Sequence, residues 1–423
     1  MNTKRIRILL SAVMLLSLAG ICQAEREGND LWNRETLTNG LGGLKDKLVD
    51  KAIEIEFSVT NIYQQNVRGG RSKHRRQGGH TGSYDLEISA DIQTLLGIEG
   101  GSLFMHTEGS WSRTDIDATS VGSAFGVNAD AAGRRSMDIT ELWYEQAMFD
   151  DALRIRLGKL DITGGFECRG CPVSFDGSAY ANDETAQFLN SALVNNSMIP
   201  FPAFGLGVIV HYSPVEWWYA SVGVIDAQAD GRGAGFRTTF HGEDYFLYTF
   251  ETGVTPQLDS AKGPLQGAYR AGFWNDPQPK ANSDGSKKYR DDVGFYLSCD
   301  QLLVKENADA DDSQGLGVFF RFGYADGKRN DITNFWSIGF QYQGLLDGRD
   351  DDVLGLGFAQ GIFSNSADMT YTDDYESVVE LYYNAQVTPW LNVSPSAQYI
   401  SNPGGDKSVS DAVVLGVRAQ MAF

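Results

Sequence analysis

The stretch Ile53-Glu54-Ile55-Glu56-Phe57-Ser58-Val59-Thr60 alternates strictly between apolar and polar side chains. Successive side chains of a β-strand point to opposite faces, so this pattern predicts a strand with one apolar face and one polar face. The same two-residue period recurs along the chain, at residues 84–91, 153–157, 316–324 and 413–423. These repeated segments predict an all-β protein.

The alternating segments are about ten residues long and carry charges on the polar face in strand after strand. A transmembrane β-strand has about this length, with apolar side chains toward lipid and polar side chains toward a wet lumen. We therefore predict a closed antiparallel transmembrane barrel of sixteen strands. The strands are expected to begin near residues 52, 83, 102, 137, 153, 204, 217, 246, 267, 293, 315, 332, 353, 375, 391 and 412.

The connections between these segments support a barrel, because their lengths alternate as they do in outer-membrane barrels. The expected connections at residues 149–152, 213–216 and 388–390 are short, whereas those at residues 64–82, 112–135, 161–203 and 227–245 are long. The segments 255–266 and 305–314 are longer than this pattern requires, and 326–331 is shorter. The short connections are expected in the periplasm and the long ones outside the cell.

Composition excludes several classes of protein. The chain has 423 residues, a net charge of −20, 48 Gly and 12% aromatic residues, with a mean hydropathy of −0.28. The acidic balance argues against a nucleic-acid partner, which requires a basic surface. With 4 Cys and 5 His, neither a disulfide-dense scaffold nor a His-based metal cluster is expected. We expect no cofactor and no metal.

The N-terminal residues predict export. Lys4, Arg5 and Arg7 precede an apolar run, and Cys22-Gln23-Ala24 fits a cleavage site, so residues 1–24 are expected to be a signal peptide. A lipoprotein anchored through Cys22 is the alternative. Residues 25–51 are expected to be a periplasmic segment with a short helix over residues 43–51, because leucines recur there at helical spacing. This helix is expected to plug or cap the periplasmic mouth of a barrel formed by residues 52–423.

Cysteines and aromatic residues give further expectations. Cys168 and Cys171 are expected to form a small loop disulfide, and Cys299 to be a buried or lipid-facing thiol. Aromatic residues near the expected strand ends fit interfacial girdles, although strand propensity alone also favours them. The members of this aromatic set are Trp111, Trp217, Trp218, Tyr219, Trp336 and Trp390.

Five stretches, in order along the chain, resemble the carbohydrate-selective porins of the OprB family. They are Leu41-Gly42-Gly43-Leu44, Leu157-Gly158-Lys159-Leu160-Asp161, Gly315-Leu316-Gly317-Val318-Phe319, Gly348-Arg349-Asp350-Asp351-Asp352-Val353-Leu354-Gly355-Leu356-Gly357, and the C-terminal segments 382–391 and 398–405. The resemblance implies a 16-stranded outer-membrane barrel that passes sugars by diffusion. The terminal Phe423 resembles the signal that bacterial barrels present to the assembly machinery. The Cys168–Cys171 insert and the basic first loop depart from the family pattern.

A diffusive pore selects by radius, charge and hydrogen bonding at its narrowest point. Arginine forks can bond vicinal hydroxyls, carboxylates can accept from them, and aromatic rings can contact the apolar faces of a sugar. The strand alternation places such residues toward the lumen, with Arg156, Arg270 and Arg321 the strongest candidates, although lumen arginines can also do no more than pair with acids. The expected pore-lining residues are Arg154, Arg156, Arg270, Arg321, Arg418, Glu54, Glu87, Glu108, Glu376, Glu380, Trp143 and Trp274. The connection 161–203 is expected either to constrict the pore from inside or to form a surface lid.

The resulting expectation is a porin for monosaccharides or small oligosaccharides, with a general or anion/inorganic-ion pore on the same barrel as the alternative. A barrel enzyme is not expected, because His106 and His211 lack a Ser or acid at convincing sequence spacing. A plugged, non-porous surface protein is also less favoured, since no repeat is present. Outer-membrane lipid and lipopolysaccharide are expected partners. The basic run at residues 71–76 is a candidate for binding lipopolysaccharide or steering anions, with a plain solvated loop as the alternative. Both a monomer and a homotrimer remain open.

Overall fold

The computed structural model describes residues 31–72, 74, 77–111, 116–130, 134–163, 175–231, 233–281, 287–309, 313–366 and 371–423. The expected signal peptide, the alternative lipid anchor at Cys22, and the Cys168–Cys171 disulfide fall outside these residues. Within them, no helix is long and apolar enough to cross a membrane.

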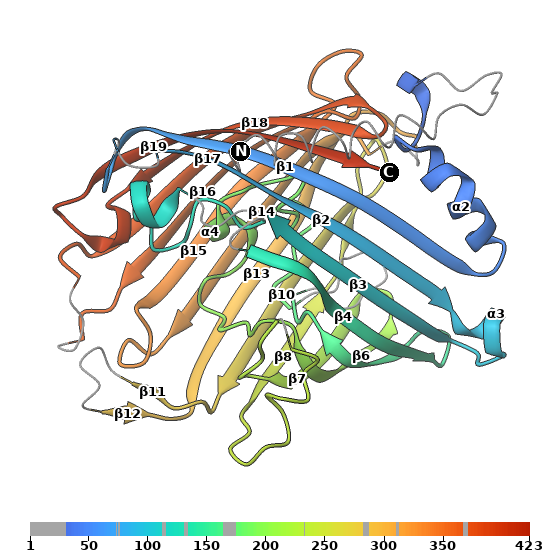
Figure 1. The fold of residues 1–423 in the computed structure, drawn as a ribbon, viewed down its shortest axis with the longest axis horizontal. Helices are drawn as coiled ribbons and strands as arrows, with labels where there is room; N and C mark the ends of the chain where they lie inside the picture. Colours follow the sequence, from blue (N-terminus) through green and yellow to red (C-terminus); the bar gives the residue numbers. More distant parts are fainter. Residues whose placement is uncertain are drawn as a thin grey trace, which may run out of the picture.

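Sixteen long antiparallel strands of the described chain form one sheet whose last strand, β19, pairs with the first, β1. This pairing closes the barrel and confirms the predicted fold class (Figure 1). The strands are β1 Ile53–Gly70, β2 Gly78–Asp91, β3 Gly101–Trp111, β4 Arg134–Met148, β5 Leu153–Leu160, β6 Gly205–Val215, β7 Trp218–Asp226, β8 Phe246–Val254, β10 Leu265–Asp276, β13 Asp292–Lys305, β14 Gly315–Ala325, β15 Ile332–Gln343, β16 Val353–Phe363, β17 Tyr375–Thr388, β18 Leu391–Ser401 and β19 Ser410–Ala422.

Short elements occupy the connections. Two-residue strands occur at β9 Gln257–Leu258, which pairs with β10, and at β11 Lys280–Ala281 and β12 Lys288–Tyr289, which pair with each other. The helical elements are the 3₁₀ turns Leu31–Asn33 and Pro403–Gly405, the π-helical turn Asp117–Val121, and the helices α2 Asn39–Val49, α3 Ile92–Leu96 and α4 Ser191–Val194.

The first connection is shorter than expected, because β1 continues to Gly70 and β2 begins at Gly78. The prediction that residues 64–82 form the first connection was therefore wrong. Its polar residues belong to the inward face of the strand: Gln64 and Asn66 are buried and donate hydrogen bonds to residues inside the barrel.

The outward face of the barrel is apolar. Leu381, Leu415 and Val417 expose nearly half of their side-chain surface, while their neighbours Glu380 and Arg418 are buried on the inward face. Burial of charged groups inside and exposure of leucine and valine outside is the inverse of a water-exposed protein, and it is the arrangement expected of a barrel wall in lipid.

The aromatic set divides between the two faces. Trp111 and Trp217 are exposed on the outside, as expected. Tyr219 was wrongly assigned to the girdle, because its ring is buried inside and its hydroxyl donates to Glu251 Oε1 at 2.6 Å. Cys299 is a half-buried free thiol that shares the outward face of β13 with Leu297.

Both α2 and the C-terminus lie at the end of the barrel that carries the short turns, here called the short-turn end (Figure 1). The segment before α2 is bound there, since the Leu37 N–H donates to the Ala422 carbonyl at 2.8 Å. The helix differs from its expected bounds: it runs over Asn39–Val49, and its first turn is left-handed at Gly40, Leu41, Gly42 and Gly43. No residue of α2 is buried.

Residues 175–199, here called the long inner segment, lie inside the barrel. Their backbone and side chains bond to inward-facing residues of β14, β17 and β19, including Arg321, Glu380 and Arg418. The described part of the 161–203 connection thus folds inward, and the surface-lid alternative is wrong. Residues 116–130, the short inner segment, also fold inward, which was not expected; Ser123 and Ala124 bond to Glu376 of β17.

Glycines on the inward face of the wall make room for the long inner segment. A Cβ atom at Gly317 would lie 2.1 Å from Cζ of Tyr180, and one at Gly357 would lie 2.8 Å from Cδ2 of Leu193. At such separations any larger side chain must displace its neighbour. Gly317 of β14 and Gly357 of β16, the second glycine of each Gly-x-Gly repeat, are therefore docking positions for the segment.

We predict that Gly317→Val displaces the Tyr180 ring and loosens the long inner segment, with a cost of about 1–3 kcal/mol for overpacking. Chymotrypsin should then cleave within the segment faster than in the unaltered protein. Ala271→Val, which adds a similar volume on the exposed outward face of β10, is the control and should leave cleavage unchanged. Equal cleavage of the Gly317→Val and Ala271→Val proteins would contradict this role for Gly317.

Candidate functional site

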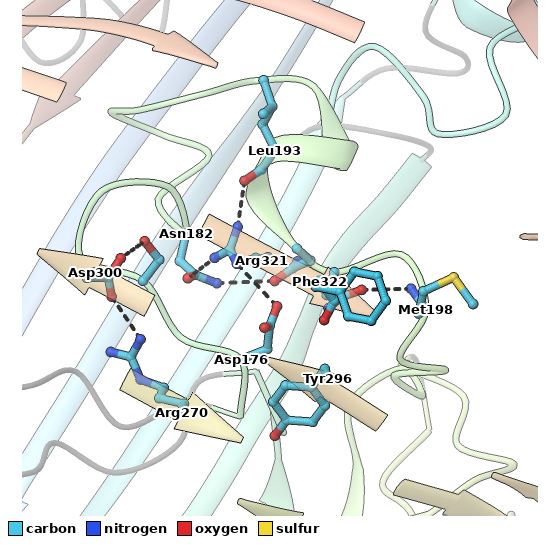
Figure 2. A network of polar contacts seen from close by, with 12 residues as sticks. Asp176, Asn182, Leu193, Met198, Arg270, Tyr296, Asp300, Arg321 and Phe322 are labelled. Atoms are coloured by element: carbon cyan, nitrogen blue, oxygen red, sulfur yellow. Dashed lines mark hydrogen bonds and ion pairs between the residues drawn. The ribbon is translucent and has the colours of Figure 1, made fainter. Parts of the chain in front are cut away.

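Arg321 of β14 holds the long inner segment from the barrel wall. Its guanidinium donates to the Leu193 carbonyl at 2.7 Å and to Asn182 Oδ1 at 2.5 Å, and its Nε lies 3.2 Å from Asp176 Oδ2 (Figure 2). The arginine and Asp176 are almost completely buried. Because a buried charge is tolerated only when paired and hydrogen-bonded, Arg321 and these partners fix one another in place.

A second ion pair lies beside the first. Arg270 of β10 donates to Asp300 Oδ2 of β13 at 2.9 Å, and the Ser178 hydroxyl of the long inner segment donates to Asp300 Oδ1 at 2.5 Å. Figure 2 shows the Arg270–Asp300 pair next to Arg321 and Asp176. Asp300 therefore links a wall arginine to the segment.

Wall side chains also satisfy the backbone of the long inner segment. Glu380 accepts the N–H groups of Leu189 at 3.0 Å and Asn190 at 2.8 Å. Arg418 donates to the carbonyls of Glu184 at 2.7 Å and Gln187 at 2.9 Å. A segment without regular secondary structure inside a barrel needs such partners, since unpaired backbone groups are costly when buried.

The short inner segment is held in the same way. Glu376 accepts from the Ser123 hydroxyl at 2.5 Å and from the Ala124 N–H at 2.8 Å. The two inner segments then bond to each other, since the Ala129 N–H donates to the Leu189 carbonyl at 2.8 Å. Together they narrow the space enclosed by the strands.

A different environment surrounds the arginines of β5. Arg156 donates to Glu145 Oε2 at 3.0 Å, and its guanidinium lies 3.7 Å from the centre of the Trp143 ring. Phe104, on the other neighbouring strand, stacks on the same indole at 4.9 Å. Arg154 lies 3.8 Å from Glu145 and keeps about 27% of its side chain exposed.

The structure thus separates the expected pore-lining residues into two groups. One group is buried, and Arg321, Arg418, Glu376 and Glu380 of this group bind the inner segments directly; the buried members are Arg270, Arg321, Arg418, Glu376, Glu380 and Trp274. Arg156 is also buried, but against Trp143 and Glu145 of the wall. The remaining residues retain some exposure; they are Arg154, Glu54, Glu87, Glu108 and Trp143.

Several partners of these residues were not anticipated from sequence. Asp176, Asn182 and Ser178 lie in a connection without a periodic pattern, so no signal marked them as partners of wall arginines. Asp300 and Glu251 do lie on inward faces of alternating strands, and the same criterion that selected Arg270 could have found them.

His106 and His211 have partners that sequence spacing did not show. His106 Nε2 lies 3.2 Å from Asp85 Oδ1, and His211 Nδ1 lies 2.8 Å from Ser221 Oγ. The absence of a Ser or acid at convincing sequence spacing thus did not exclude such a neighbour in space. His211 is fully buried, so a solute in the lumen does not reach the His211–Ser221 pair, and His106 contacts carboxylates rather than a nucleophile.

A cavity of about 540 Å³ lies between the long inner segment and the short-turn end. Its lining includes Lys45 of α2, Asp183 of the long inner segment, and Glu87 and His106 of the wall. The cavity therefore joins the N-terminal segment, the inner segment and the strands around one space.

Comparison with known proteins agrees with this architecture. The family model described as carbohydrate-selective porin, OprB family, matches residues 75–423. The chain belongs to the OprB family of carbohydrate-selective porins. It is an outer-membrane porin, and its family and fold are those of channel proteins rather than enzymes.

Individual relatives match over nearly the whole chain. "Porin B" of Pseudomonas aeruginosa is 25% identical over 92% of this porin and 92% of its own length. "Putative porin QuiX" of Acinetobacter baylyi is 22% identical over 97% and 98%, respectively. The structure titled "High pH structure of Pseudomonas putida OprB" superimposes with a TM-score of 0.78 at 19% identity, covering 93% of this chain and 100% of that one.

We predict that Arg321→Met weakens attachment of the long inner segment, because it leaves Asp176 as a buried carboxylate without its arginine. Removing one partner of a buried ion pair costs about 3–5 kcal/mol. Single-channel recordings of this porin should then show larger and noisier currents. The double variant Arg321→Met/Asp176→Asn removes the uncompensated charge and should recover part of the original behaviour; recordings identical to the unaltered porin in both variants would contradict the assignment.

The lumen charge should also depend on pH through Glu184. Burial, together with the nearby carboxylates of Asp130 and Asp183, raises the pKa of this carboxyl to about 8. Glu184 is therefore mostly neutral at pH 6 and becomes negative as the pH passes 8. We predict that preference for cations, measured as the zero-current potential in a KCl gradient, increases between pH 6 and pH 9. Glu184→Gln should reduce this increase, leaving the part due to Asp130, whose buried carboxyl has a pKa of about 7; an unchanged pH profile in the Glu184→Gln variant would contradict the assignment.

Proposed function

We propose that the porin passes small carbohydrates by passive diffusion through the space left between the two inner segments and the wall of β1 to β5. The observation that carries this proposal is the long inner segment, which is bonded to wall residues and narrows the barrel. A narrowed, polar passage selects small uncharged polyols by their size and their hydrogen bonding, without a reaction step. The family and the printed name of the P. aeruginosa relative support a porin on this fold.

Hydroxyl groups of a passing sugar would meet the less buried polar side chains of this wall. Arg154 offers guanidinium N–H donors toward the lumen, while Glu87 and Glu108 on β2 and β3 offer acceptors. Arg156 and Trp143 present less free surface, because each covers the other. The fully buried charged residues act in this proposal as positioning groups for the inner segments.

A general or ion-conducting pore on the same barrel is the second candidate, since charged side chains line the wall in both signs. The two candidates differ in two measurable respects: a sugar-selective pore discriminates among neutral solutes of different size, and its ion current is reduced by sugar in the lumen.

Other expectations remain proposals of the same kind. We propose that residues 1–24 act as a signal peptide, that residues 25–51 lie in the periplasm, and that Phe423 engages the assembly machinery. Phe423 is held at the short-turn end, where its N–H donates to the Phe57 carbonyl at 2.9 Å. We also propose that the end of the barrel opposite the short-turn end contacts lipopolysaccharide, and that the porin is either a monomer or a trimer.

Liposome swelling tests the carbohydrate proposal. Proteoliposomes containing this porin should swell faster in glucose than in isosmotic disaccharide. Arg154→Gln removes an exposed donor, and one lost hydrogen bond, about 1 kcal/mol, should slow monosaccharide entry about fivefold.

Lys328→Gln removes the same charge from an exposed position in the connection 326–331 and serves as the matched control. Equal swelling in mono- and disaccharide, together with an ion current that sugar does not reduce, would favour the general or ion pore. An Arg154→Gln rate equal to that of the control would remove this arginine from the passage.

A further inference from the structure

The cavity at the short-turn end differs in charge from the lumen as a whole. Sequence alternation places arginines and carboxylates on the inward faces in similar numbers, which suggests a balanced lumen. In the folded chain the two signs are distributed differently. The described residues that line this cavity include five carboxyl groups and no arginine.

No arginine lines the described cavity because the inner segments and the wall engage four of the lumen arginines elsewhere. Arg321 and Arg418 bind the long inner segment, Arg270 binds Asp300, and Arg156 binds Glu145. All four are buried. A solute in the cavity therefore does not meet their guanidinium groups directly.

The carboxyl groups of the cavity keep most of their charge available. Glu56 exposes 67% of its side chain, with Lys45 at 3.7 Å. The Asp183 carboxylate is bonded to the N–H groups of Thr185 and Ala186 in its own turn. The five carboxyl groups are Glu56, Asp85, Glu87, Asp183 and Glu184.

Only two cationic groups face these acids among the lining residues, namely Lys45 and His106. Even with His106 protonated and Glu184 neutral, four carboxylates oppose two positive charges. A space walled by low-dielectric protein and lined by one sign of charge focuses the field and concentrates counter-ions. The cavity thus attracts cations and repels anions.

The same cavity also has an aromatic wall. Phe57 and Phe423 lie with ring centres 5.2 Å apart, and the Trp390 indole N–H is fixed by the Leu31 carbonyl at 2.8 Å. Aromatic rings accept the apolar C–H face of a sugar ring and attract ammonium groups. A volume of about 540 Å³ is within the range of small-molecule sites.

We propose that this cavity makes the porin selective by solute charge, and that protonated amino sugars are the class it favours, ahead of neutral sugars and well ahead of sugar acids and sugar phosphates. The inference rests on the proposed function, because it assumes that sugars cross the lumen. It adds a preference that arises because the buried arginines are engaged away from the cavity, where carboxylates outnumber the cationic groups of the lining.

The test compares three solutes of one size in proteoliposomes at pH 6 and low ionic strength, where screening is weak. These are glucose, glucosamine as the cation and glucuronate as the anion. Glucosamine should enter faster than glucose, and about tenfold faster than glucuronate, the low end of the range for electrostatic focusing. The zero-current potential in a KCl gradient should independently show preference for K⁺.

The double variant Asp183→Asn/Glu87→Gln removes two charges from the cavity and should bring the glucosamine-to-glucuronate ratio close to one. The control Asp347→Asn/Asp350→Asn removes the same charge from an exposed turn outside the cavity lining and should leave the ratio unchanged. If the double variant fails to fold, the charge preference is still tested by Glu56→Gln, which lies at an exposed position, and by the zero-current potential of the unaltered porin.

The outcomes distinguish the charge preference of the cavity from the carbohydrate function of the porin. Entry of glucose with no advantage of glucosamine over glucuronate, or an equal ratio in the cavity and control variants, overturns the charge preference alone. Failure of glucose itself to enter, with ion current intact, overturns the carbohydrate function on which the inference rests.

Discussion

The bonds between charged wall side chains and the backbone of the long inner segment determine the rest of this structure. An irregular segment inside a barrel must satisfy its N–H and carbonyl groups there, because buried polar groups without partners are costly. Glu380 accepts hydrogen bonds from two backbone N–H groups of the segment, while Arg321 and Arg418 donate hydrogen bonds to its carbonyls. The wall charges that sequence analysis assigned to solute contact are therefore engaged first in holding the segment.

This use of charge has two consequences. The inner segment is fixed across the lumen and narrows it. Arg321 and Arg418 are engaged by the segment and do not line the cavity at the short-turn end, where carboxylates remain. Apolar packing acts in the same direction: Phe188 of the segment packs edge-on against Tyr382 and Phe319 of the wall, with ring centres 5.0 and 5.7 Å apart. Polar bonds fix the position of the segment, and aromatic contacts fill the space behind it.

Much of the fold could be predicted because strand alternation is a local property. The inward face of β14, with Gly317, Phe319 and Arg321, follows directly from the two-residue period. The extension of β1 was missed because Gln64 and Asn66 are polar on a face that meets the short inner segment, so their neighbours look like a loop in sequence. The left-handed turn at Gly40 to Gly43 was missed because leucine spacing alone suggested one continuous helix.

The candidate site was predictable only in part, for a different reason. Alternation shows which way Arg321 and Glu380 point, but their partners lie 128 and 190 residues away in a connection with no period. Whether a lumen charge meets solute or protein depends on where that connection folds, and no local pattern encodes it. For the same reason the Gly-x-Gly repeats could be recognised as motifs without their docking role being evident.

In the proposed function the long inner segment, held by wall charges, sets the width of the passage. The most direct test of this role replaces residues 176–199 with a short Gly-Ser linker and measures the size cut-off for neutral sugars by liposome swelling. The account predicts that disaccharides and trisaccharides, slow in the unaltered porin, then enter at rates close to that of glucose. A size cut-off unchanged by the replacement would contradict it.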